Sequence, residues 1–152
     1  MPKMNWFDLG THKMGRIAEY YAMLEFASYG CPIYTTEIDE GVDFVAKVGA
    51  EFYEIQVKSM TRGKYVYVLK SSMSINDKKR LVCFLRFAEG EPPEIFIIPA
   101  TSWKRPNAVL KNNVYPDTRK SPPEWGIYYA DRNLHILEKH RAEAFFTRHG
   151  LA

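Results

Sequence analysis

The sequence contains only two cysteines, Cys31 and Cys83, and neither belongs to a CxxC pair. It therefore predicts no disulfide framework and no thiolate zinc site, which suits the reducing cytoplasm. The histidines near the C-terminus fit no zinc-ligand spacing either. An N-terminal apolar signal core and an apolar run of transmembrane length are both missing, so we expect a cytoplasmic protein with no membrane partner. GxSxG, P-loop and Rossmann fingerprints are absent as well.

The composition is that of an ordinary globular protein. The chain has 152 residues, of which 46% are hydrophobic and 26% are charged. This length fits one domain, spanning residues 1–152, and we find no internal repeat or low-complexity tract. A formal net charge of +3 is too small to identify a nucleic-acid partner by itself.

The charges are distributed unevenly along the chain. Acidic residues crowd into positions 37–54, whereas positions 58–80 hold seven basic residues and a single acid, Asp77. A second basic stretch runs over positions 104–120, with Asp117 as its only acid. Acids that gather a metal ion, followed by bases that meet phosphates, are a layout that suits a nuclease. The alternative is that these lysines and arginines form ordinary solvated surface.

Hydrophobic spacing indicates one long helix followed by strands. Apolar residues recur at helical spacing over 13–29, with Thr11 as the expected N-cap and Gly30 where the helix should end. The period then changes to two, which predicts strands over 33–36, 42–48, 52–58, 64–69, 81–87 and 94–98.

The last third of the sequence is less regular. Residues 101–123 are rich in Pro, Asn and Lys, and we expect a long connection with one helical turn that faces the substrate. A strand over 125–129 and a closing helix over 137–148 follow. The order of elements predicts an α/β or α+β sheet with flanking helices.

A predicted hairpin holds the candidate site. Gly49-Ala50 joins its two strands, and glycine in the first central position suits a two-residue type II′ turn. That turn fixes a register in which Asp43 lies directly opposite Gln56, with Cβ atoms about 4.5–5.5 Å apart. Gln56 and Lys58 share a face because strand side chains alternate. Two oxygen ligands and one ammonium group should therefore converge.

This convergence has a chemical use. Mg²⁺ prefers oxygen ligands, usually one or two carboxylates together with waters and substrate phosphate. Asp43 offers a carboxylate, Gln56 an amide oxygen and Val57 its backbone carbonyl. Lys58 can orient the attacking water and neutralise charge on phosphoryl oxygens. We expect a magnesium site in which Mn²⁺ can substitute.

These residues resemble the PD-(D/E)XK nuclease superfamily, which carries a helix glutamate, then an aspartate, then a (D/E/Q)-x-K tripeptide on the next strand. The matching residues are Glu19, Asp43 and Gln56-Val57-Lys58, in roughly the first half of the chain. The resemblance implies a restriction-endonuclease-like mixed β-sheet flanked by helices and hydrolysis of DNA phosphodiester bonds. It also implies that Asp43 is the central metal ligand, that Glu19 is an additional or water-mediated ligand, and that Lys58 helps to activate water.

The sequence departs from the common pattern of that superfamily at two positions. Val42 stands where proline usually precedes the aspartate, and Gln56 stands where Glu or Asp is usual. A neutral amide binds a hard cation more weakly than a carboxylate, so we expect modest metal affinity. Glu54, on the same face as Gln56, is a substitute ligand. The alternatives are that Gln56 and Lys58 lie in solvent, and that Glu19 points to solvent beside Arg16.

We therefore expect a metal-dependent DNA endonuclease, sequence-specific in the manner of homing or restriction enzymes. Because a small chain with one site must cut two strands, we expect a homodimer or a higher homo-oligomer. A structure-selective nuclease of the Holliday-junction-resolvase kind, a DNA-binding protein of nuclease fold without catalysis, and an RNA-processing enzyme stay open as alternatives. The candidate DNA contacts are basic and hydroxyl side chains near the site and in the second basic stretch: Ser59, Arg62, Lys64, Lys78, Lys79, Arg80, Lys104 and Arg105.

Overall fold

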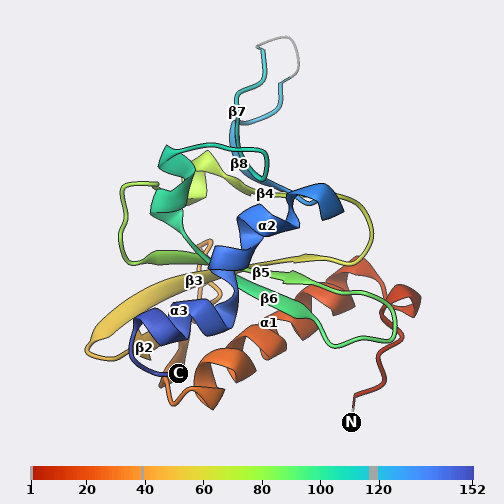
Figure 1. Ribbon diagram of the computed structural model, residues 1–152. Coiled ribbons are helices and arrows are strands. Elements are labelled where there is room, and N and C mark those ends of the chain that lie inside the picture. Colours follow the sequence, from red (N-terminus) through yellow and green to blue (C-terminus); the bar gives the residue numbers. More distant parts are fainter. Residues whose placement is uncertain (1, 39, 117–119) are drawn as a thin grey trace.

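The computed structural model of the protein describes residues 2–38, 40–116 and 120–152 (Figure 1). Three charged residues of the acidic and basic stretches, Asp39, Asp117 and Arg119, lie outside these described residues. The helices and strands follow in the order α1 (Thr11–Ser28), β1 (Ile33–Thr35), β2 (Phe44–Val48), β3 (Glu51–Met60), β4 (Tyr65–Leu69), β5 (Arg80–Arg86), β6 (Glu94–Pro99), β7 (Leu110–Asn113), β8 (Glu124–Tyr128), α2 (Leu134–Leu137) and α3 (Ala142–Arg148). Short 3-10 turns are η1 (Trp6–Asp8), η2 (Lys70–Ser72), η3 (Ala100–Lys104), η5 (Asp131–Asn133) and η6 (Glu138–His140).

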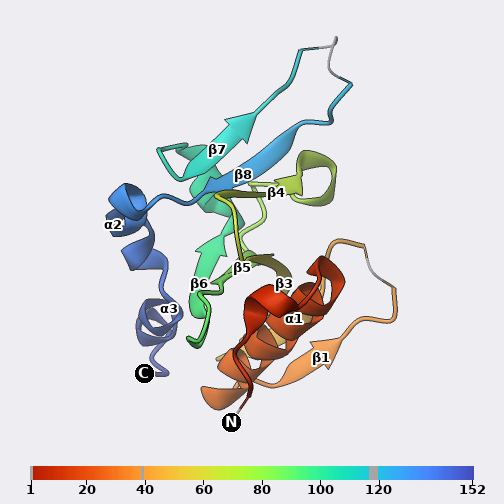
Figure 2. The ribbon, with the colours of Figure 1, turned by 90° about the vertical axis from the view of Figure 1, so that its right-hand side faces the viewer.

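The strands form two sheets. The larger sheet has the order β1-β2-β3-β5-β6, in which β3 and β5 run parallel and the other neighbours run antiparallel. The smaller sheet has the order β4-β8-β7 and is antiparallel. Figures 1 and 2 show α1 lying along the larger sheet and the β7–β8 ribbon projecting from the body. The predicted α/β class, with a mixed sheet flanked by helices, is confirmed.

Two separate cores hold the layers together, one on each face of the larger sheet. On one face, residues of α1 and α3 pack against β2, β3 and β5, with Phe26, Phe44 and Ile55 fully buried. On the other face, β5 and β6 pack against the smaller sheet, η3 and α2, with Trp103 at the centre. Full burial of each such side chain contributes about 1.5–3 kcal/mol.

The ends of α1 show how the sequence sets its limits. Gly10 is the N-cap and Thr11 the first helical residue, so the predicted cap is one residue too late, and the glycine has no side chain with which to cap the helix. At the other end, Gly30 adopts a φ of +84°, and the N–H of Cys31 donates to the carbonyl of Phe26 at 3.1 Å. A left-handed glycine with this backbone bond is the usual way to end a helix.

Two predicted segments differ from the structure. Residues 101–123 contain the strand β7, which pairs with β8, and not only a connection with one helical turn. Its residues are Leu-Lys-Asn-Asn, and asparagine disfavours strands, so only the pairing with β8 reveals it. The closing helix expected over 137–148 is divided, because Arg141 adopts extended backbone and bridges to Phe96 of β6.

Two expectations about absences can be compared with the structure. Cys31 and Cys83 are both free and buried, as the lack of a disulfide framework predicted. No helix among the described residues combines the length and the apolar character that a membrane crossing requires.

Candidate functional site

The register of the β2–β3 hairpin agrees with the sequence. Val48 pairs with Glu51 across the turn, and Gly49 has a φ of +63°, as its place in a type II′ turn requires. The last pair of the ladder is Phe44 with Ile55, which makes Asp43 and Gln56 the next two residues outward. The N–H of Asp43 donates to the carbonyl of Ile55 at 2.8 Å, so the strands are still in contact at this point.

The Asp43 carboxylate accepts a backbone hydrogen bond just beyond the point where the pairing of β2 and β3 ends. Its Oδ2 accepts a hydrogen bond from the N–H of Val57 at 2.6 Å. This bond to an ionised acceptor is short, and such bonds are about twice as strong as neutral ones. The carboxylate thus satisfies the N–H of Val57, which would bond to the backbone of β2 if that strand were longer. Its direction is fixed beside the Gln56-Val57-Lys58 tripeptide.

The second half of β3 forms the floor of an open groove of about 580 Å³. Its walls come from the first turns of α1, from β4 and from η2. A smaller hollow of about 390 Å³ shares part of this lining and continues toward Phe7. We call the two together the β3 groove; it is lined by Gln56, Val57, Lys58 and Ser59 on β3, Thr11 and Gly15 on α1, Tyr65 and Tyr67 on β4, and Arg62 beyond β3.

Glu19 lies one helical turn beyond Gly15, so both residues project from the same side of α1. Its carboxylate pairs with Arg16 at 2.9 Å, with 29% of the Glu19 side chain and 67% of the Arg16 side chain exposed. The structure therefore contains the ion pair of the stated alternative, on the side of the helix that borders the groove. An exposed pair of this kind contributes at most about 1 kcal/mol.

Gln56 and Lys58 differ in exposure although they share a face. Gln56 is buried, and its Oε1 accepts a hydrogen bond from the Arg80 guanidinium at 3.3 Å. Lys58 is half-buried at the groove floor. Glu54, the substitute ligand, pairs with Arg80 at 3.1 Å. The alternative in which Gln56 lies in solvent does not hold, because its side chain is enclosed.

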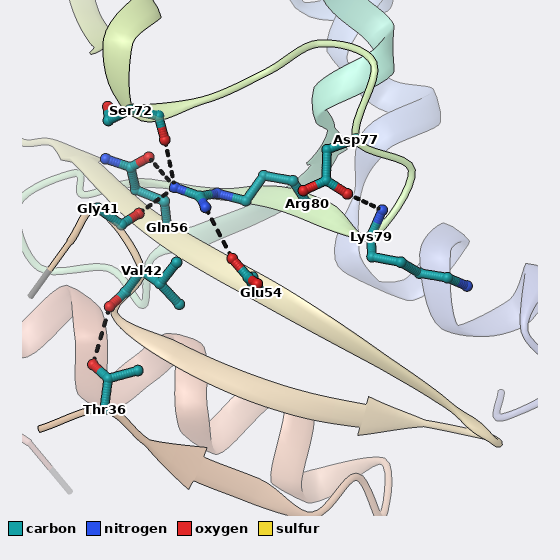
Figure 3. A network of polar contacts seen from close by, with 9 residues as sticks. All are labelled: Thr36, Gly41, Val42, Glu54, Gln56, Ser72, Asp77, Lys79 and Arg80. Carbon is teal, nitrogen blue, oxygen red and sulfur yellow. Dashed lines mark hydrogen bonds and ion pairs between the residues drawn. The ribbon is translucent and has the colours of Figure 1, made fainter. Parts of the chain in front are cut away.

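Arg80 is the residue whose placement departs most from expectation. It was expected to contact DNA, but it is only 6% exposed and lies beside Gln56 at the start of β5 (Figure 3). Its guanidinium bonds to groups on β3, on η2 and in the turn before β2. A buried cation so enclosed does not reach a phosphate in this structure, so the expected DNA contact is corrected to a structural contact within the site.

The other candidate DNA contacts are divided between the groove and remote surfaces. Ser59 and Arg62 line the β3 groove, and the Arg62 guanidinium lies 4.3 Å above the ring of Phe7. Lys64 lines a separate hollow formed with Arg86 and Asp131.

Four further lysine and arginine candidates lie away from the groove. Lys104 and Arg105 border a hollow of about 230 Å³ on η3 and η6. Lys79 pairs with Glu51 at 2.9 Å, and Figure 3 shows its side chain directed away from Gln56. Lys78 is exposed in the turn before β5.

Several groove residues were missed by the sequence argument. Thr11, Gly15 and Glu19 follow one another at a spacing of four, which would have placed the first two beside the site had Glu19 been used as a reference. Tyr65 lies among basic residues in the sequence, which suits nucleic-acid contact, but its spacing does not place it in the groove. Its hydroxyl donates to the Glu124 carboxylate and accepts from the Asn113 side chain at 2.6 Å. Burial, together with the bond to Glu124, raises the pKa of Tyr65, so this phenol stays neutral.

The donor set decides what kind of ion the site could hold. The described residues contain no group of three or more His, Cys, Asp and Glu side chains placed to hold a metal ion. The candidate oxygen donors are the Asp43 carboxylate and, on the adjacent strand β3, the Gln56 amide oxygen and the Val57 carbonyl oxygen. Such hard oxygen donors suit Mg²⁺ or Mn²⁺, and a set with little negative charge holds them weakly. Burial raises the pKa of the neighbouring Cys83 thiol, and the charges of Glu25 and Asp43 add to this, so the thiol stays protonated.

The chain was compared with known proteins. No protein-family model and no curated protein matches it. Among solved structures it is similar to the bacterial homing endonuclease I-Ssp6803I, with 15% identity and a TM-score of 0.48, over 86% of this chain and 94% of that chain. It is also similar to Hjc, a Holliday junction resolvase from the archaeal hyperthermophile Archaeoglobus fulgidus, with 12% identity and a TM-score of 0.46, over 76% of this chain and 84% of that chain. At these identities and TM-scores, the similarity assigns neither a family nor an activity to this chain.

Proposed function

We propose that the protein is a metal-dependent endonuclease that hydrolyses DNA phosphodiester bonds, with Mg²⁺ as its cofactor and Mn²⁺ as a substitute. The observation that carries the proposal is the position of the Asp43 carboxylate. It accepts a hydrogen bond at 2.6 Å from the N–H of Val57, and Val57 lies between Gln56 and Lys58 on the floor of an open groove. Hydrolysis of a phosphodiester needs an acid to hold a cation and an amine beside it, and Asp43 and Lys58 would supply these groups.

The shape of the groove suits a polymer. It is open along its length and continues from the β4 side past Ser59 toward Arg62 and Phe7. An extended backbone with regularly spaced phosphates can lie along such a path, and Arg62 and Lys58 supply positive charge for it. A phosphate centred over the tripeptide would meet the Lys58 ammonium.

Each residue has a defined part in this proposal. Asp43, with the Gln56 amide oxygen and the Val57 carbonyl, would hold the cation, and Glu19 would join through water from α1. When bound, Mg²⁺ supplies Lewis-acid polarisation of a phosphoryl oxygen and lowers the pKa of a coordinated water. Lys58 orients the attacking water and offsets the charge that develops on the phosphoryl oxygens. Ser59 and Arg62 position the flanking phosphates.

Plasmid cleavage with Mg²⁺ or Mn²⁺ tests the proposal. We expect Asp43→Asn and Lys58→Met each to lower the cleavage rate by about 10²-fold or more, since each removes a charge used in the transition state. Lys79→Met is the matched control, because Lys79 pairs with Glu51 away from the groove. Cleavage that survives both site substitutions would refute the assignment.

A second candidate function is DNA binding without cleavage. One observation favours it: the Gln56 oxygen already accepts a bond from a cationic guanidinium. In that case the wild-type protein would retard a DNA duplex in a gel but would not nick it with either metal. Arg62→Ala would weaken retardation, whereas Asp43→Asn would strengthen it by removing a negative charge from the groove.

We also propose that the chain acts as a homodimer, since one groove per chain addresses one strand. Sedimentation velocity with and without a DNA duplex measures this state. The same preparations, offered a four-way junction and a linear duplex of equal length, separate structure selectivity from sequence selectivity. Preferred cleavage of the junction would favour the resolvase-like alternative.

A further inference from the structure

A buried arginine lies directly beside Gln56, one of the proposed cation ligands. Arg80 is 6% exposed, and its Nη2 donates to Gln56 Oε1 at 3.3 Å, to the carbonyl of Ser72 at 2.9 Å and to the carbonyl of Gly41 (Figure 3). Its Nη1 donates to Glu54 Oε2 at 3.1 Å. A buried guanidinium is tolerable only when hydrogen-bonded, and these four acceptors provide most of the required bonds.

This arginine joins three segments that are far apart in the sequence. Gln56 is on β3, Ser72 closes η2, and Gly41 lies two residues before Asp43. Gly41 is tightly fitted: its φ is +81°, and a Cβ at this position would lie 3.3 Å from Arg80 Nη2. The guanidinium therefore fixes the Gln56 amide and also the approach of the chain to Asp43.

The charge of Arg80 matters as much as its bonds. A guanidinium is ionised at every physiological pH, so it is a permanent positive charge in contact with the Gln56 oxygen. A like charge disfavours a second cation nearby, and the neutral amide supplies no negative charge to compensate. A glutamate at position 56 would instead form an ion pair with Arg80, and its carboxylate would be neutralised before any metal arrived.

We propose that Arg80 is a positioning residue that also sets the cation affinity of the site. It orients the Gln56 oxygen, and its fixed charge keeps the affinity of the DNA-free protein for divalent cations low. A divalent cation is then held firmly only when the negative charge of a phosphodiester enters the groove. This inference rests on the proposed function, because it takes Asp43 and Gln56 as cation ligands.

Calorimetric titration of DNA-free protein with Mn²⁺ tests the inference without measuring activity. We expect Arg80→Met to tighten Mn²⁺ binding by about tenfold or more, the scale on which one nearby charge acts. Arg80→Lys keeps the charge and should keep the weak affinity of the wild type. A buried methionine leaves backbone acceptors unpaired, so thermal unfolding of each variant is measured alongside.

Gln56→Glu gives a test that does not depend on the folding of Arg80→Met. Because the new carboxylate pairs with Arg80, we expect Mn²⁺ affinity to change less than about threefold. Combined with Arg80→Met, the same substitution should tighten binding by about 10²-fold, which is more than additive. An increase of tenfold or more from Gln56→Glu alone would overturn the inference, as would Arg80→Met with unchanged affinity and an intact fold.

The same titration separates this inference from the proposed function. If Asp43→Asn leaves Mn²⁺ binding intact, or if no variant binds Mn²⁺, the proposed cation site is wrong and the role of Arg80 falls with it. If Asp43→Asn abolishes binding while the Arg80 and Gln56 variants show no coupling, only the role of Arg80 is wrong.

Discussion

The two faces of the larger sheet are covered in different ways, and the candidate site follows from the difference. One face is covered by α1 and α3 and is apolar along the strands, with Phe44, Ile55 and Leu81 buried. The other face is covered by the smaller sheet, η3 and α2, and along β3 it carries Glu54, Gln56 and Lys58. Because side chains alternate along β3, the residues that pack in the apolar core and the candidate site residues lie on opposite faces of the same strand.

The second cover is incomplete over β3, and this is what leaves the groove. The first face is covered by the two helices α1 and α3, whereas the cover of the second face is assembled from shorter segments between residues 65 and 137. Met60 is buried under it, but Lys58 and Ser59 remain at the floor of the β3 groove. A polar strand face can remain open when its cover is assembled from short pieces.

We expect the largest loss of stability from a substitution that creates a cavity on the apolar face. Ile55 is fully buried, so Ile55→Ala should lower the free energy of unfolding by about 2–5 kcal/mol. Lys58→Ala, three residues on but on the open face, should change it by no more than about 0.5 kcal/mol. Urea unfolding followed by circular dichroism measures both, and similar losses would show that the faces are not distinct.

The next effect concerns the smaller sheet. A Cβ on Gly126 would overlap the Tyr65 ring, which crosses the strand there. Gly126→Ala should therefore lower the free energy of unfolding by about 1–3 kcal/mol, because Tyr65 must move and loses its bond to Glu124. Tyr65→Ala removes the overlap, so the double variant should lose less than the sum of the single ones. Additive losses would contradict this packing.

A pH effect follows from His140, which is buried in η6. Burial, with the charges of Lys139 and Arg148, lowers the pKa of His140 from its ordinary value of 6.5 to about 4. Between these two pH values His140 binds a proton in the unfolded chain but not in the folded one. Its contribution to the free energy of unfolding is therefore complete above pH 6.5 and is lost as the pH falls toward 4. His140→Leu should flatten this part of the stability profile. The exposed His135→Gln should leave it unchanged.

We expect the smallest change in stability from a substitution on α1, at Gly15. A Cβ on Gly15 meets nothing within 4 Å, so Gly15→Ala should raise the free energy of unfolding by about 0.5–1 kcal/mol. Gly15→Trp should instead obstruct the β3 groove and weaken DNA binding while the fold persists. If the tryptophan variant binds DNA as tightly as the wild type, DNA does not pass along the α1 side of the β3 groove.

Local patterns predicted much of the first half of the molecule. The turn at Gly49 and the alternation of β2 and β3 were sufficient to predict the register from Val48 with Glu51 to Phe44 with Ile55. The helix limits were correct to within about two residues because Gly30 marks its end. These features depend on neighbours in the sequence, which a sequence displays directly.

Contacts between distant segments could not be predicted in this way. Arg80 differs from Lys78 and Lys79 only by being the first residue of β5, and its burial depends on the parallel pairing of β5 with β3. The strand β7 exists because β8 pairs with it, and its own residues are poor strand formers. The division of basic residues between the groove and remote surfaces likewise depends on tertiary packing.

The bond from the Val57 amide to Asp43 has a practical consequence. One carboxylate accepts a backbone hydrogen bond where the β2–β3 pairing ends and would also carry the charge that the proposed hydrolysis needs. Asparagine keeps an oxygen that can receive the Val57 N–H, whereas alanine keeps none. Asp43→Asn should therefore preserve the shape while silencing the reaction, which makes it the variant of choice for capturing the protein with an intact substrate.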